Sequence, residues 1–90
     1  MAITVNKPAT FTIAGKEFKS IEKEEYRLYI YPDMTIRIDK PKGLYVNRKD
    51  DGTTSHYVLD QNGESWYIHP GWRALRWKCP EGEEFLFIGG

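Results

Sequence analysis

The two histidines are the side chains best suited to metal or acid–base chemistry. Two alternating runs, residues 54–61 and 64–69, flank Asn62-Gly63, a dipeptide typical of a two-residue hairpin turn. That turn would set His56 directly opposite His69, with their Cβ atoms about 4.5–5.5 Å apart. Both imidazoles could then reach one bound ion.

A metal site at this pair would be incomplete. Zinc needs three or four ligands in a tetrahedral shell. The nearest polar side chains on the same strand face, Asp60 and Ser65, would lie too far along the hairpin to supply them. His56 and His69 are therefore weak metal candidates, and we predict no cofactor.

RNA cleavage is the one enzymatic reaction for which the chain offers suitable groups. It needs two acid–base groups and a cation near the phosphate, which His56, His69, Glu64 and Arg73 could supply. The chain contains no G-x-S-x-G, P-loop, H-E-x-x-H or Gly-rich dinucleotide motif. Its single cysteine, Cys79, lies in an apolar strand pattern and is predicted to be inert. We therefore predict that the protein is not an enzyme and keep a small metal-free ribonuclease as a third hypothesis.

A stripe of aromatic and basic residues is the first candidate binding surface. Alternation over residues 26–31 and 35–39 puts Arg27, Tyr29, Tyr31 and Arg37 on one strand face, and Tyr45 could extend it. Rings that stack on bases and guanidinium groups that bind phosphate suit single-stranded nucleic acid or a nucleotide. Tyrosine and arginine are equally typical of protein–protein contacts. An aspartate opposite Arg27 weakens the phosphate interpretation, and ordinary cross-strand packing on a solvated face is the alternative.

The segment from Trp72 to Cys79 is the second candidate surface. We favour a strand, with a helix as the alternative, because the surrounding pattern is all β. Trp72, Arg73 and Arg76 could then anchor a partner through an exposed indole and its neighbouring cations. The competing interpretation is that both tryptophans of the segment belong to the core.

Period-2 patterns interrupted by short turns predict the elements that position these residues. A Gly15-Lys16 turn would set Ile13 opposite Phe18, and a three-residue loop after Tyr31 would set Ile30 opposite Ile36. Further strands are expected at 44–48, 72–79 and 84–88. The predicted core consists of Leu28, Ile30, Ile36, Ile38, Tyr57, Leu59, Trp66 and Ile68.

The pattern predicts an all-β fold of about seven or eight short strands. Ninety residues make one domain, residues 1–90. We favour a small antiparallel barrel, because the chain is short for two well-filled sheets. The alternative is an immunoglobulin-like sandwich, because residues 6–12 resemble the opening strand of bacterial immunoglobulin-like modules.

Composition favours a binding protein of the cytoplasm. Thirteen basic and thirteen acidic residues balance, which argues against bulk electrostatic binding of nucleic acid. One cysteine makes no internal disulfide, and the sequence has neither a signal-like run nor a stretch of membrane-spanning length. We predict a protein partner, with an accessory, inhibitory or assembly role of the kind that phage proteins perform. A nucleotide or single-stranded nucleic acid is the alternative ligand, and pairing through residues 84–88 could produce a homo-oligomer.

Overall fold

The computed structural model describes residues 10–80, which contain eight β-strands and no helix. None of this part of the chain could therefore cross a membrane as a helix. The strands are β1 (Thr10–Ile13), β2 (Lys16–Ser20), β3 (Tyr26–Ile30), β4 (Thr35–Asp39), β5 (Pro41–Arg48), β6 (Thr54–Asp60), β7 (Ser65–Ile68) and β8 (Ala74–Lys78).

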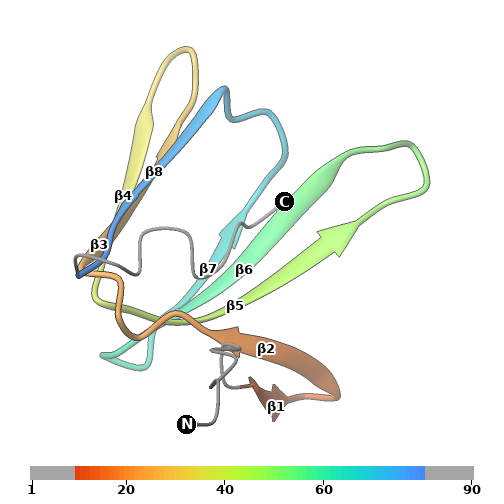
Figure 1. Ribbon diagram of the computed structural model, residues 1–90. Helices are drawn as coiled ribbons and strands as arrows, with labels where there is room; N and C mark the ends of the chain where they lie inside the picture. Colours follow the sequence, from red (N-terminus) through yellow and green to blue (C-terminus); the bar gives the residue numbers. More distant parts are fainter. Residues whose placement is uncertain (1–9, 81–90) are drawn as a thin grey trace, which may run out of the picture.

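The strands form two antiparallel sheets that splay apart like the arms of a V (Figure 1). The larger sheet has the order β1-β2-β5-β6-β7, and the smaller has the order β4-β3-β8. The chain changes sheet after β2, after β4 and after β7, and the second of these crossings is at Lys40, whose φ of 50° makes a sharp corner between β4 and β5. The Lys40 amide donates to the carbonyl of Glu25 at 2.9 Å, and its carbonyl accepts from the Gln61 amide at 2.9 Å. The corner is thus hydrogen-bonded on both sides.

The prediction of a small all-β fold is confirmed, but no closed barrel is found among the described strands. Two pairs that are distant in sequence, β2 with β5 and β3 with β8, complete the sheets. β5 begins at Pro41, before the start of the strand predicted at 44–48, and a bulge lies between Pro41 and Gly43. The predicted strand at 84–88 lies outside the described residues.

The hydrophobic core fills the space between the two sheets. Ile38 of the smaller sheet and Leu44, Val58 and Ile68 of the larger sheet are buried there, and Trp66 and Ile36 pack against them. The prediction was therefore right for Ile38 and Ile68.

The other predicted core residues lie elsewhere. Leu28, Ile30, Tyr57 and Leu59 are only partly buried, and each lies next to a fully buried residue, as alternation in a strand requires. They belong to the outer faces of the two sheets. For these four residues, the predicted strand faces were reversed.

The first hairpin differs from the prediction by one residue in its turn. Ala14 and Gly15 form the turn, and both have positive φ, at 51° and 78°. Two consecutive positive φ values define a type I′ turn. The strands consequently pair Phe11 with Phe18 and Ile13 with Lys16.

Candidate functional site

Three residues of the predicted binding stripe are buried. Arg27, Tyr29 and Tyr31 point into the space between the sheets, and Arg27 and Tyr29 have no exposed surface. The stripe that the sequence predicts therefore does not exist as a surface. Arg37 is exposed and Tyr45 is half-buried, but they lie on different sheets.

The loop between β3 and β4 explains this error. Ile30 pairs with Thr35, so four residues rather than three form the loop, and the Tyr31 amide donates to the carbonyl of Met34 at 2.8 Å. The longer loop shifts the pairing by one position and reverses the face that β3 presents relative to β4.

A buried chain of hydrogen bonds links the two sheets. The Glu24 carboxylate accepts from Nε and Nη2 of Arg27 at 2.8 and 2.7 Å, in a two-pronged ion pair. Nη1 of Arg27 donates to the Tyr29 hydroxyl at 3.2 Å. The Tyr29 oxygen lies 2.7 Å from Nδ1 of His56 on the opposite sheet. The charge of Arg27 is therefore compensated inside the molecule, where an unpaired cation would be very costly.

The protonation states in this chain follow from burial. Desolvation, together with the positive charges of Arg27 and Arg48, lowers the pKa of His56 to about 4. Desolvation raises the pKa of Tyr29 to about 12, against the opposing effect of Arg27. At neutral pH the Tyr29 hydroxyl and the His56 imidazole are therefore both uncharged, and one hydrogen bond joins them. Among the described residues, Nε2 of His56 has no hydrogen-bond partner.

The predicted pairing of the two histidines was wrong. The β6–β7 turn contains three residues, 61–63, and the Asp60 amide donates to the carbonyl of Glu64 at 2.9 Å. Oδ1 of Asp60 accepts from the amides of Asn62 and Glu64, both at 2.9 Å. Gly63 has the positive φ that was predicted, 84°, but Asn62 does not, so the turn is not type I′.

This turn separates the histidines. His56 pairs with Ile68 and is fully buried, whereas His69 is exposed and stacks on the Tyr31 ring at 4.6 Å. No group of three metal-ligating side chains occurs within residues 10–80. The hypotheses of a shared metal ion and of an RNA-cleaving pair at these histidines therefore have no geometric support in the described residues.

The Trp72 segment is partly as predicted. Residues 74–78 form strand β8, and Leu75 and Trp77 pair with Tyr29 and Arg27 of β3. Trp72 is half-buried and its ring lies 5.3 Å from that of Tyr29. Its indole is therefore only partly exposed, and its role in anchoring a partner stays a prediction.

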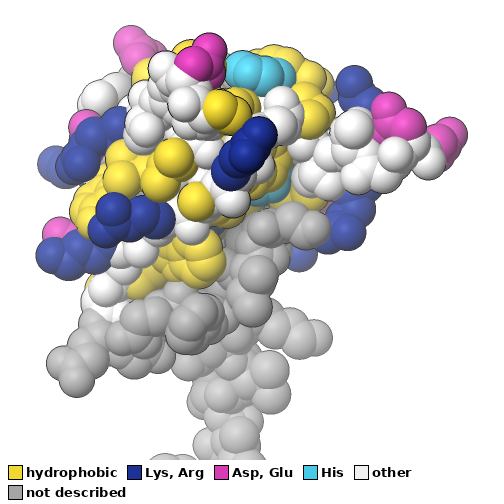
Figure 2. All heavy atoms as spheres, turned by 90° about the horizontal axis from the view of Figure 1, so that it is seen from above, with side chains coloured by type: hydrophobic (Ala, Val, Ile, Leu, Met, Phe, Trp, Pro, Cys, Tyr) yellow, Lys and Arg dark blue, Asp and Glu magenta, His cyan; other side chains and the backbone are white. Residues whose placement is uncertain are grey.

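The exposed arginines of this segment contribute to a mixed surface on the smaller sheet. Arg37 lies over the Tyr26 ring at 4.6 Å and is bonded to Asp39 at 2.8 Å. Arg73, Arg76 and Lys78 are exposed on or beside the neighbouring strand. Figure 2 shows hydrophobic and basic side chains side by side on the left of the molecule, where Figure 1 places this sheet.

The larger sheet carries a second surface that sequence reasoning missed. Its outer face bears one aromatic ring from each of its five strands, and each ring contacts the next. We call this row the aromatic ladder; it consists of Phe11, Phe18, Tyr45, Tyr57 and Tyr67. Neighbouring ring centroids lie 5.7, 5.8, 5.8 and 5.1 Å apart along the row. Phe18 is buried, and Tyr67 is the most exposed of the five rings, at 51 %.

The two ends of the ladder differ. At the β1 end, Phe11 packs so closely over Gly43 that a Cβ there would overlap its ring, which holds this end tightly on the sheet. At the β7 end, the rings of Tyr57 and Tyr67 are in contact but tilted by 48° to one another, and Tyr67 is exposed. The Lys16 ammonium lies 5.7 Å from the Tyr45 ring centroid and 6.0 Å from that of Tyr57.

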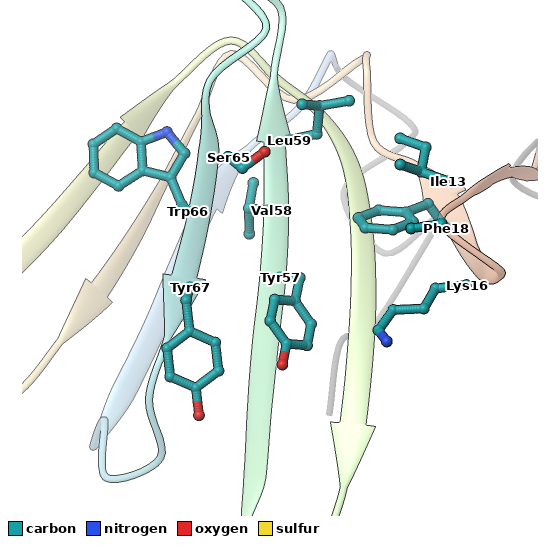
Figure 3. Close-up of a pocket in the computed structure, with 10 residues that line it drawn as sticks. Ile13, Lys16, Phe18, Tyr57, Val58, Leu59, Ser65, Trp66 and Tyr67 are labelled. Atoms are coloured by element: carbon teal, nitrogen blue, oxygen red, sulfur yellow. The ribbon is translucent and has the colours of Figure 1, made fainter.

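A hollow of about 370 Å³ lies between the β1–β2 hairpin and the outer face of β6 and β7 (Figure 3). Ile13, Lys16 and Phe18 face it from the hairpin, and Tyr57 and Tyr67 face it from the sheet. Lys16 is the only charged side chain among its described lining residues. A concave, mostly apolar wall with one cation is suited to binding rather than to covalent chemistry.

The chain matches no protein-family model, no curated protein and no solved structure. Its function must therefore be argued from the described surfaces themselves.

Proposed function

We propose that the protein is a non-catalytic binding module that contacts another protein through the aromatic ladder. The exposure of Tyr67 beside the half-buried rings of Tyr45 and Tyr57 carries this proposal. Exposed tyrosines offer large, rigid contact areas with a hydroxyl at the edge, and they are enriched among residues that dominate binding energy. A cytoplasmic accessory, inhibitory or assembly protein, such as phages encode, would act through a surface of this kind.

Charge favours a protein over nucleic acid at this surface. Proteins that bind single strands combine stacking rings with a groove of cations that follows the phosphates. The hollow beside the ladder has Lys16 as its only described charge. One cation is too few for a backbone that carries a charge at every nucleotide.

Single-stranded nucleic acid or a nucleotide is a second candidate ligand, and the smaller sheet favours it. Tyr26 and the exposed cations Arg37, Arg76 and Lys78 share its outer face. Two of these cations are already paired, Arg37 with Asp39 and Lys78 with Glu25. This reduces the charge available for phosphate.

The test compares one tyrosine pair with one control. The wild-type protein, the double variant Tyr57→Ser/Tyr67→Ser and Tyr26→Ser are immobilised and used to capture partner proteins. A partner retained by the wild type and Tyr26→Ser but lost by the double variant supports the proposal. Equal retention by all three proteins places binding elsewhere. Binding of single-stranded DNA or RNA that falls steeply with salt, and that Tyr26→Ser reduces, supports the second candidate instead.

A further inference from the structure

We infer that the aromatic ladder binds an extended, proline-rich peptide segment that carries an acidic residue. This inference rests on the proposed function and names the chemistry of the partner. Three observations carry it: the spacing of the rings, their tilt and exposure, and the position of the single cation.

The separation of every second strand in a sheet is close to the repeat of a polyproline II helix. Such a helix has three residues per turn and rises about 3.1 Å per residue, so its side chains repeat every 9.3 Å or so. Two strand spacings in a sheet amount to about 9.6 Å. A peptide lying across the strands would therefore place residues i and i+3 over Tyr67 and Tyr45, on either side of Tyr57. These three tyrosines come from consecutive neighbours in the sheet, β7, β6 and β5.

The rings of the ladder are tilted to one another and do not form a flat platform. The ring of Tyr57 is turned by 31° from that of Tyr45 and by 48° from that of Tyr67. Proline-rich segments dock in grooves between aromatic side chains, and their preformed helix loses little entropy on binding. Flat stacking on bases would instead favour rings that lie open side by side.

The position of Lys16 predicts the charge of the ligand. Its ammonium lies above Tyr45 and Tyr57, at the border of the hollow, and no described acidic side chain lines that hollow. The cation could therefore attract an acidic residue of the peptide as the prolines settle over the tyrosines. A basic residue at the same place would be repelled.

The test uses synthetic peptides with a fluorescent label. The first probe is an oligoproline flanked by aspartates, the second an oligoproline flanked by lysines, and the third a flexible glycine–serine peptide flanked by aspartates. We expect the wild-type protein to bind the first probe about fivefold more tightly than the second, because of one exposed ion pair. We expect the third probe to bind most weakly, because it lacks a preformed helix.

Substitutions in the protein separate the parts of the inference. Tyr67→Ser should weaken binding of both oligoprolines by roughly thirtyfold, as the loss of one central contact residue does. Lys16→Glu should reverse the preference between aspartate and lysine probes. Two control variants, Tyr26→Ser on the other sheet and Lys49→Glu in the β5–β6 turn, should change neither result.

Each failure has a separate meaning. Equal binding of the glycine–serine and oligoproline probes would overturn the inference, and so would oligoproline binding that survives Tyr67→Ser. If no oligoproline binds while partner capture still depends on Tyr57 and Tyr67, the ligand class is wrong and the proposed function stands. If capture also survives the substitutions at Tyr57 and Tyr67, the proposed function fails as well.

Discussion

Arg27 was predicted from the sequence to lie on the surface, but it belongs to the interior. Its side chain has no exposed area, and its guanidinium donates hydrogen bonds to Glu24 and Tyr29. Burial alone would lower the pKa of Arg27, but the hydrogen bonds and the charge of its neighbours raise it. The guanidinium thus stays charged inside the molecule. The stability of the fold therefore depends on the Glu24 carboxylate that neutralises this charge.

Glu24→Gln should destabilise the protein strongly. The substitution keeps the size of the side chain but leaves Arg27 buried without its counter-ion, a change that typically costs about 3–5 kcal/mol. Urea unfolding measures the loss. The matched control is Asp39→Asn, which breaks the exposed pair with Arg37 and should cost less than about 1 kcal/mol. Equal losses for the two variants would show that the buried pair is not special.

His56 should make stability fall on mild acidification. Its pKa is lowered from 6.5 to about 4 in the folded state, so between these pH values the unfolded chain binds the proton and the folded chain does not. The contribution is fully present above pH 6.5 and is lost as the pH falls toward 4. It amounts to about 3 kcal/mol at most.

The check on His56 is a set of urea unfolding curves between pH 4 and 7. His56→Gln removes the titrating group, so its stability should vary less with pH over this range than that of the wild type. Parallel pH profiles for the two proteins would assign the effect to other groups.

At the scale of the elements, the sequence predicts where strands lie far better than how they pair. Most predicted strands among residues 10–80 are found, including the one at 74–78. The predicted registers differ by one position in the β3–β4 and β6–β7 hairpins and by two in the β1–β2 hairpin, because each turn differs from the expected one. In the β6–β7 turn, the carboxylate of Asp60 accepts hydrogen bonds from two backbone amides, and these bonds stabilise a three-residue loop. Asn62-Gly63 alone does not reveal that choice.

Each one-position slip moves every side chain of a strand to the opposite face. This is why the predicted binding stripe became core and why the ladder was missed. Tyr45 was the one ladder residue among the predicted site residues. The others could be grouped only by knowing that β2 pairs with β5, a contact that no local pattern specifies.

Gly63→Val should weaken the β6–β7 hairpin through the backbone alone. The glycine has a φ of 84°, and a Cβ at this position would meet open space. The cost is therefore conformational and should be about 1–2 kcal/mol, as for other residues forced into this region. Gly63→Asn is the control and should cost less, because asparagine tolerates positive φ. Thermal unfolding of both variants provides the measurement, and equal losses would rule out the backbone explanation.

At the scale of the whole molecule, the two sheets are held together by polar as well as apolar contacts. Tyr29 takes part in both kinds of contact. Its ring contacts Trp72 and belongs to the buried core, and its hydroxyl is hydrogen-bonded to His56 of the other sheet. Tyr67 lies on the outer face of the other sheet and is half exposed. Tyr29 therefore serves the fold, whereas Tyr67 is the residue proposed to serve binding.

Tyr29→Ser and Tyr67→Ser should consequently have very different effects. Tyr29→Ser leaves a large cavity and removes a hydrogen-bond partner from both Arg27 and His56, so it should cost at least about 3–5 kcal/mol, enough to unfold a small domain. Tyr67→Ser removes one cross-strand ring contact, with Tyr57, and should cost about 1 kcal/mol or less. Near-ultraviolet circular dichroism and thermal melting distinguish the outcomes. A folded Tyr29→Ser protein, or an unfolded Tyr67→Ser protein, would mean that the inner and outer faces of the sheets are assigned the wrong way round.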